Sequence, residues 1–231
     1  NKKNIILKKI LLKTDKINEN YISKKIKFNK KLMNGIEKIL FSSVVPSVFF
    51  KFKYFFKRKF KKKCYELKDL KLNKIIKVKV NKKQIGSDRL ANSLAVINKR
   101  KNFIIVDFGT ATTFDVVVKD IYLGGVIAPG VHLSLNTLSS KAKLIPKISL
   151  SKNSNVIGRN TISAVRSGFY WGYAGLIENI IKLISKQSKK SYKIIFTGGY
   201  SSLFQNSINV KASIKKDLTI QGLLKVIKYI K

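Results

Sequence analysis

The chain has 231 residues, 45% of them hydrophobic, and carries 49 Lys and Arg against 11 Asp and Glu, a formal net charge of +38 at pH 7. This length can bury one large core or two small ones, and no apolar run approaches the ~20 residues that a membrane-spanning helix needs. Cys64 is the sole cysteine and His132 the sole histidine. These counts exclude a disulfide framework and a metal site built from thiolates or several imidazoles, and they fit a protein of the reducing cytoplasm.

The excess of positive charge is almost entirely lysine, spread along the whole chain. Proteins that recognise bases or clamp phosphates usually favour the two-pronged guanidinium of arginine. We therefore predict no specific nucleic-acid partner, although non-specific contact with RNA or anionic lipid is expected at low salt. The densest basic stretch is 49–63, where apolar residues at 49, 52, 56 and 60 fit one helix face. It predicts a packed helix with a lysine-rich outer face, with a membrane-surface helix or an RNA-stacking patch as alternatives.

Hydrophobic periodicity divides the chain into two halves, each with strands first and helices after. In the first half we expect strands at 5–12 and 38–42 and helices at 47–62 and 88–98. A polar run at 98–102 is the predicted boundary, so the predicted domains are 1–98 and 99–231. In the second half we expect strands at 103–107, 113–118, 122–127 and 193–196, and helices at 131–144, 160–186 and 221–230. The pattern predicts an α/β fold.

The most informative stretch follows the apolar run at 103–106. It is Asp107-Phe108-Gly109-Thr110-Ala111-Thr112-Thr113, which leads into the next strand. The carboxylate ends a strand, the glycine turns the backbone, and three hydroxyls follow. Such a hairpin can present backbone N–H groups, hydroxyls and one acid to an anionic ligand. A plain hairpin with no ligand is the alternative.

A second stretch, Gly86-Ser87-Asp88-Arg89, opens an amphipathic helix with apolar residues at 90, 91, 94, 95 and 97. Ser87 and Asp88 could simply cap that helix. They could equally place a catalytic acid beside a cation, because a helix N-terminus favours the ionised form of Asp88. Arg89 could then grip a substrate carboxylate with a two-point fork.

These two stretches, in this order and close together, resemble the type III pantothenate kinases. Further motifs similar to those of the family follow from about residue 10 to the C-terminus: Phe41-Ser42-Ser43-Val44-Val45-Pro46, Tyr122-Leu123-Gly124-Gly125-Val126-Ile127-Ala128-Pro129-Gly130, Ile157-Gly158-Arg159-Asn160-Thr161, Ser167-Gly168 through Tyr173, Thr197-Gly198-Gly199 and Leu218-Thr219-Ile220-Gln221-Gly222-Leu223. The resemblance implies two ribonuclease-H-like halves, as in actin and the sugar kinases, with ATP in the cleft between them. It also implies ATP-dependent phosphorylation of pantothenate to 4'-phosphopantothenate, the first step of coenzyme A biosynthesis, by a cytoplasmic homodimer.

The resemblance assigns a role to each motif residue. Asp88 is the general base. The pantothenate pocket is lined by Gly86, Ser87, Asp88, Arg89 and Thr161. Asp107 holds a monovalent cation, K⁺ or NH₄⁺. ATP, with Mg²⁺ on its phosphates, is contacted by Thr110, Gly198 and Gly199.

The chain departs from the family pattern in two places. The family begins with a strand carrying Asp-x-Gly-Asn-Thr, the first phosphate motif, and nothing from Asn1 onward matches it. We therefore expect the first strand hairpin to be missing from the N-terminal half. Where the family usually has a substrate-contacting tyrosine before Gly86, the chain has Val80, which offers no hydroxyl. The alternatives to an active kinase are a catalytically degenerate member that acts as a binding or regulatory protein, and a basic nucleic-acid-binding protein on the same scaffold.

The helix predicted at 160–186 carries Gly168, Gly172 and Gly175 along one side. Three glycines destabilise a helix, so we expect a neighbouring backbone to pack closely against them, as at a helix–helix contact. The apolar side chains of this helix are spread around its axis, which predicts that more than one face is buried. Both features suit a subunit interface.

Overall fold

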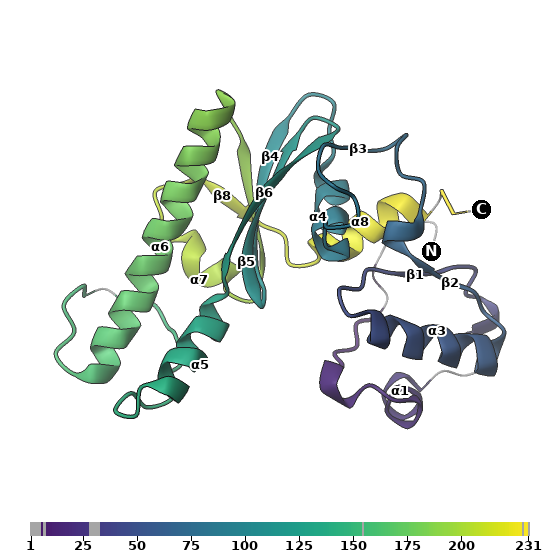
Figure 1. Cartoon of the computed structure of the whole chain (residues 1–231), viewed down its shortest axis with the longest axis horizontal. Helices are drawn as coiled ribbons and strands as arrows, with labels where there is room; N and C mark the ends of the chain where they lie inside the picture. Colours follow the sequence, from purple (N-terminus) through teal and green to yellow (C-terminus); the bar gives the residue numbers. More distant parts are fainter. Residues whose placement is uncertain (1–5, 7, 28–32, 154, 228, 231) are drawn as a thin grey trace. The chain divides into compact units, whose positions relative to one another are not determined.

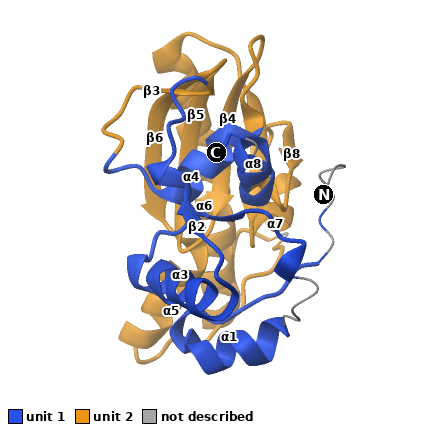
Figure 2. Ribbon diagram, turned by 90° about the vertical axis from the view of Figure 1, so that its right-hand side faces the viewer, with its two compact units in different colours: residues 1–74, 83–95, 219–231 blue, residues 75–82, 96–218 orange. Residues whose placement is uncertain are grey.

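The structure, a computed structural model, describes residues 6, 8–27, 33–153, 155–227 and 229–230 (Figure 1). Contacts between residues divide the chain into two units, which Figure 2 distinguishes by colour. Unit 1 comprises Asn1–Lys74, Lys83–Ala95 and Thr219–Lys231, and unit 2 comprises Ile75–Lys82 and Val96–Leu218. The C-terminal segment is therefore grouped with the N-terminal segments.

Unit 1 contains a small two-stranded parallel sheet. Most helices of this unit precede unit 2 in the sequence. Its elements are η1 (Thr14–Lys16), α1 (Glu19–Ile26), β1 (Ile39–Phe41), α3 (Pro46–Phe60), β2 (Cys64–Glu66), η2 (Leu67–Asp69), α4 (Ser87–Val96) and α8 (Leu218–Ile227). Strands β1 and β2 pair in parallel, with Ile39 opposite Cys64.

The strand predicted at 5–12 is not present in its described part. Residues 6 and 8–12 have no regular structure, and the other positions of that stretch lie outside the described residues. Residues 8–11 are exposed. Alternation of lysine with isoleucine or leucine is not sufficient to form a strand, because a strand also needs a neighbour whose backbone groups can pair with its own.

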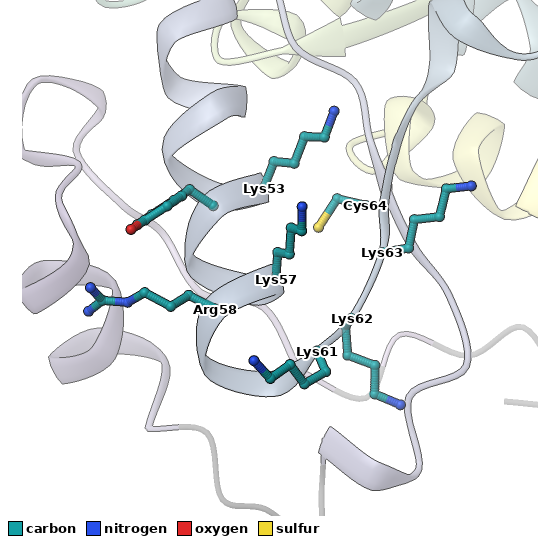
Figure 3. A pocket seen from close by; sticks show the side chains of 8 residues that line it. Lys53, Lys57, Arg58, Lys61, Lys62, Lys63 and Cys64 are labelled. Carbon is teal, nitrogen blue, oxygen red and sulfur yellow. The ribbon is translucent and has the colours of Figure 1, made fainter.

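Helix α3 packs against α1 through one face and exposes the other. Pro46 begins the helix at a position where its missing N–H costs nothing. Its apolar side buries Phe49, Phe55 and Phe56 in the core of unit 1. Its exposed residues include Lys51, Lys53, Lys57, Arg58 and Lys59, and Figure 3 shows three of them projecting from the helix. The prediction of a packed helix with a lysine-rich outer face is confirmed.

Unit 2 is built on a six-stranded mixed sheet in the order β3-β6-β5-β4-β7-β8. The strands are β3 (Lys77–Val78), β4 (Asn102–Phe108), β5 (Ala111–Val118), β6 (Ile121–Pro129), β7 (Lys193–Gly198) and β8 (Ala212–Ile214), and the helices are α5 (Val131–Lys141), α6 (Thr161–Ser188) and α7 (Ser201–Gln205). Strands β4, β5 and β6 form an antiparallel meander, and β7 and β8 continue the sheet parallel to β4. The fold is mixed α/β, as predicted. Among the described residues, no helix combines the length and the apolar character that crossing a membrane requires.

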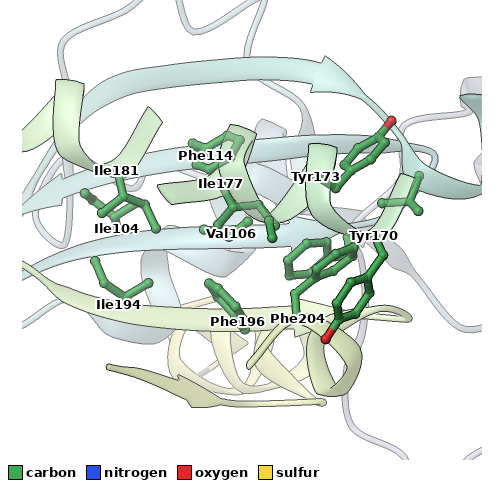
Figure 4. Close-up of a cluster of buried hydrophobic side chains, with 13 residues drawn as sticks. Ile104, Val106, Phe114, Tyr170, Tyr173, Ile177, Ile181, Ile194, Phe196 and Phe204 are labelled. Carbon is green, nitrogen blue, oxygen red and sulfur yellow. The ribbon is translucent and has the colours of Figure 1, made fainter. Parts of the chain in front are cut away.

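The core of unit 2 lies between the sheet and α6 (Figure 4). Ile104 and Val106 of β4, Phe114 of β5 and Phe196 of β7 point toward this helix. The fully buried residues of α6 follow one stripe at helical spacing: Ser167, Tyr170, Tyr173, Ala174, Ile177 and Ile181. Phe169, Trp171, Leu176, Ile180 and Ile184 of the same helix are partly buried against this core, so burial of α6 extends beyond the stripe, and a subunit interface on this helix stays a prediction.

The three glycines of α6 lie outside that stripe. Gly168, Gly172 and Gly175 are exposed, and a Cβ added to any of them would meet no heavy atom within 4 Å. The prediction of a closely packed neighbouring backbone is therefore wrong within this chain. The aromatic and aliphatic side chains of the stripe pack against the sheet, because they bury far more apolar area than glycine can.

Candidate functional site

The predicted catalytic acid lies in the first turn of α4, in unit 1. Asp88 is half-buried, and its Oδ1 accepts a hydrogen bond of 2.8 Å from the backbone N–H of Arg89. A Cβ on Gly86 would come within 2.5 Å of the same oxygen. Glycine at 86 therefore leaves the room that the carboxylate of Asp88 occupies. The carboxylate is held at a helix N-terminus, where the helix dipole favours an anion.

Ser87, also among the predicted pantothenate residues, is held in place by Glu66, a residue that the sequence pattern did not indicate. Glu66 is the last residue of β2, and its Oε1 accepts from the Ser87 hydroxyl at 2.5 Å and from the Ser43 backbone N–H at 3.3 Å. Burial raises the pKa of Glu66, the hydrogen bonds from Ser87 and Ser43 partly oppose that rise, and the nearby charge of Asp69 adds to it. Glu66 thus ties the chain after β1 to the start of α4. The only feature of the sequence that points to Glu66 is that acidic residues are rare, 11 in a chain of net charge +38.

Helix α8 braces α4 directly behind Asp88. The hydroxyl of Thr219 donates to Asn92 Oδ1 at 2.8 Å. The backbones come so close that a Cβ on Gly222 would lie 1.8 Å from the carbonyl oxygen of Ala91. Because Ala91 lies less than one turn after Asp88, this contact fixes the helix that positions the acid.

The predicted phosphate turn joins β4 to β5 in unit 2. Asp107 lies near the end of β4, opposite Thr113 of β5 and Thr197 of β7. Gly109 and Thr110 are exposed in the turn. Thr112, in contrast, is completely buried, so its hydroxyl does not face solvent. The turn can present the Thr110 hydroxyl and backbone groups to an anion.

The second glycine pair is brought beside Asp107 by the parallel pairing of β4 with β7. Gly198 has φ +85°, and a Cβ on it would lie 2.7 Å from Asp107 Oδ1 and 2.6 Å from the carbonyl oxygen of Phe108. The backbone N–H of Gly199 donates to that same carbonyl oxygen at 3.0 Å. Both the backbone angle and the available space therefore require glycine at 198. Asp107, Gly198 and Gly199 share the carboxyl end of two parallel strands, the edge where α/β sheets bind ligands.

Thr161, the last predicted site residue, is the exposed first residue of α6, in unit 2. The helix start is fixed by a capping box between Asn160 and Ser163. No hydrogen bond connects Thr161 to the other predicted site residues within the described ranges. The predicted site residues therefore form two separate groups, Gly86 to Arg89 within unit 1 and Asp107 with Gly198 and Gly199 within unit 2.

The residues present fit a phosphate ligand better than a dedicated divalent-metal cage. The described residues contain no group of three or more His, Cys, Asp and Glu that could hold a metal ion. Asp107 is a single carboxylate at a turn, which suits a loosely held monovalent cation, whereas Mg²⁺ commonly arrives with the phosphates of its nucleotide and needs few protein ligands. The exposed Gly109-Thr110 turn beside it is open to such phosphates.

Comparisons with known proteins identify the family of the chain. The family model for type III pantothenate kinases matches residues 4–183. A type III pantothenate kinase of Pelagibacter ubique (strain HTCC1062) is 58% identical over 231 residues, 100% of this chain and 93% of that protein. One from Ruegeria sp. (strain TM1040) is 41% identical over 83% of this chain and 75% of that protein. One from Cereibacter sphaeroides (strain ATCC 17029 / ATH 2.4.9) is 46% identical, over 63% of this chain and 57% of that protein.

A solved structure has a similar fold at low identity. A Campylobacter jejuni protein described as a Baf family transcriptional activator matches with a TM-score of 0.57 and 22% identity, over 86% of each chain. That likeness concerns the fold alone. The family model covers well over half of the chain and the P. ubique protein aligns along all of it, so the chain belongs to the type III pantothenate kinase family.

Proposed function

We propose that the chain transfers the γ-phosphoryl group of ATP to the primary hydroxyl of pantothenate and so catalyses the first step of coenzyme A biosynthesis. The observation that carries this proposal is Asp88, a half-buried carboxylate held at the start of α4 between Gly86 and Arg89. Family membership supplies the substrate. The proposal includes a cytoplasmic homodimer and the two halves 1–98 and 99–231, each ribonuclease-H-like. The strand order of unit 2, a three-stranded meander extended by two parallel strands, supports that half of the proposal.

In this proposal Asp88 orients the pantothenate hydroxyl and accepts its proton. Oδ1 is already engaged by the Arg89 backbone N–H, so Oδ2 is the oxygen that faces the substrate hydroxyl. A carboxylate is a weak base for an alcohol, so its main contribution is to hold the hydroxyl in line and to take the proton late in the transfer. Gly86 and Ser87 line the same pocket, and the Arg89 guanidinium pairs with the pantothenate carboxylate.

The unit 2 residues are assigned to the nucleotide. Thr110 contacts ATP, Gly198 and Gly199 allow the backbone to approach it, and Asp107 holds K⁺ or NH₄⁺. Mg²⁺, bound with ATP, would neutralise charge on the phosphates during transfer. Thr161 completes the pantothenate pocket.

A coupled ATPase assay with and without pantothenate, in K⁺ and Mg²⁺, tests the proposal. We expect Asp88→Asn to lower pantothenate-dependent turnover by about 10²–10⁴-fold, because the amide cannot accept the proton. Asp15→Asn is the matched control, since Asp15 is an exposed acid of the same unit, and it should leave turnover within about two-fold of wild type. Folded wild-type protein without pantothenate-dependent turnover would refute the kinase proposal and leave a catalytically degenerate binding protein.

A further inference from the structure

Unit 1 has a basic pocket that none of the kinase assignments uses. It has a volume of about 710 Å³ and lies between the end of α3 and the segment that leads into β2 (Figure 3). Its lining residues are Lys53, Tyr54, Lys57, Arg58, Lys61, Lys62, Lys63 and Cys64. Figure 3 shows Lys53 and Lys57 projecting from α3 on the side that faces Cys64. The volume lies in the range of ligand-binding pockets, about 300–1,000 Å³.

The positive charge of this pocket is mostly uncompensated. No Asp or Glu lines it, and Arg58 is its one cation that pairs with a carboxylate, Glu19 at 2.7 Å, among the described residues. The ammonium of Lys62 donates to a backbone carbonyl instead. Lys57 and Lys61 have no acidic partner in the part of the chain that the structure describes. The helix dipole accounts for cations in the last turn of α3, but not for Lys61, Lys62 and Lys63, which follow it.

The lysines are arranged in a row. Lys53, Lys57 and Lys61 follow each other four residues apart, which puts one turn, about 5–6 Å, between neighbours and about 12 Å between the ends of the row. Like charges at this spacing repel each other, and an anion bound along the row would relieve that repulsion. Because the row is longer than one phosphate, its geometry favours a ligand with several successive anionic groups.

Exposed aromatic rings lie beside this row. Phe50 is 60% and Tyr54 58% exposed, and they are one helical turn apart on the outer side of α3. Exposed aromatic rings next to a row of lysines are the combination that single-stranded nucleic acids bind, with bases stacked on the rings and phosphates on the cations. An anionic membrane would instead need the apolar face of the helix, and the structure buries that face through Phe49, Phe55 and Phe56.

We propose that this pocket binds single-stranded nucleic acid without sequence preference. Lys53, Lys57 and Lys61 contact successive backbone phosphates, and the ring of Tyr54 stacks with an unpaired base. Lysine makes point-charge contacts with phosphates and carries no two-point base recognition, so the binding is independent of sequence. The site is separate from the residues assigned to phosphoryl transfer and holds whether or not the chain is an active kinase.

Fluorescence anisotropy with a labelled twelve-nucleotide oligo-uridine RNA tests the proposal at 150 mM KCl and across a salt series. Because a chain of net charge +38 attracts RNA everywhere, two triple variants of equal charge are compared. The pocket variant is Lys53→Gln/Lys57→Gln/Lys61→Gln. The control is Lys99→Gln/Lys101→Gln/Lys190→Gln, three exposed lysines of unit 2.

We expect the pocket variant to bind the RNA about ten-fold more weakly or worse. The magnitude of the slope of log K against log salt should fall by about 2, since each of the three lost phosphate contacts contributes about 0.7 to that slope. The control should change affinity by less than about two-fold. Tyr54→Phe should bind as wild type, whereas Tyr54→Leu should lose about five-fold or more with the same salt slope. Pantothenate-dependent turnover, measured in parallel, should be unchanged in all four variants.

Three results would overturn the proposal. Equal losses in the two triple variants would mean diffuse attraction by the whole surface. A twelve-base-pair duplex that binds as tightly as the single strand would exclude base stacking. If the pocket variant bound phosphatidylserine vesicles less tightly than wild type while its RNA binding was unchanged, the pocket would be a membrane site. Circular dichroism of each variant checks that the fold is intact.

Discussion

The contact between α8 and α4 predicts a large effect of adding one methyl group. A Cβ on Gly222 would lie 1.8 Å from the carbonyl oxygen and 2.6 Å from the carbonyl carbon of Ala91. Both atoms belong to the backbone of α4, so no side chain can rotate away. To reach an ordinary van der Waals contact of at least 3.4 Å, Gly222→Ala must move the two helices apart by more than about 1 Å.

The expected cost follows from two opposing terms. Alanine in place of glycine stabilises a helix by up to about 1 kcal/mol. Forcing apart two closely packed helices costs about 1–3 kcal/mol or more. We therefore expect Gly222→Ala to lower the free energy of unfolding by roughly 1–2 kcal/mol. Since α4 also carries Asp88, a shift of about 1 Å should lower turnover by on the order of 10²-fold.

Urea unfolding followed by circular dichroism measures the stability change. Gly172→Ala is the matched control, because Gly172 lies in a helix and an added Cβ meets nothing within 4 Å. It should raise the free energy of unfolding by about 0.5–1 kcal/mol. If the glycine side of α6 seats a second subunit, as the proposed homodimer implies, this gain becomes a loss at high protein concentration. A Gly222→Ala protein as stable as wild type would refute the packing argument.

Two further predictions concern buried ionisable groups of unit 1. Burial raises the pKa of Glu66, so the folded protein holds that proton more tightly than the unfolded chain, and stability falls as pH rises from the ordinary glutamate pKa through the raised one. Glu66→Gln, which can still accept from Ser87, should therefore gain stability relative to wild type as pH rises above the ordinary glutamate pKa of about 4.3, and a pH-independent difference in urea midpoints would contradict this. Burial also raises the pKa of the Cys64 thiol to about 11, so its alkylation by iodoacetamide at pH 8 should be on the order of a hundred-fold slower in native protein than in urea, as mass spectrometry can measure. Equal rates in the two conditions would show that the thiol is not protected.

The sequence predicts long, periodic elements well. The hairpin expected at 103–107 and 113–118 is found as β4 and β5, because a continuous apolar run next to a glycine turn carries its own local signal. The short strands β2, β3 and β8 were not predicted, since two or three residues are too few for a period. Their pairing depends on neighbours distant in sequence, as with β3 on β6.

Long-range packing explains what the sequence could not predict. The glycines of α6 and Gly222 of α8 look alike in the sequence, yet the former face open space and the latter touches Ala91. Nothing local distinguishes them. Glu66 was missed for the same reason, because its partner Ser87 lies 21 residues away and meets it only in the folded unit.

The two predicted functional carboxylates show how local and distant information combine. Asp88 Oδ1 lies 2.5 Å from where Gly86 would carry a Cβ, and Asp107 Oδ1 lies 2.7 Å from the same point on Gly198. In both units, therefore, an aspartate oxygen lies beside a glycine, and at Gly198 the positive φ and the nearby Phe108 backbone also require glycine. The first pair is two residues apart and is visible as a sequence motif, whereas the second is joined only by the pairing of β4 with β7. A glycine close to an acid in the sequence can thus indicate a functional site when the glycine makes room for that acid. For Gly198, the neighbouring acid is identified only by the pairing of β4 with β7.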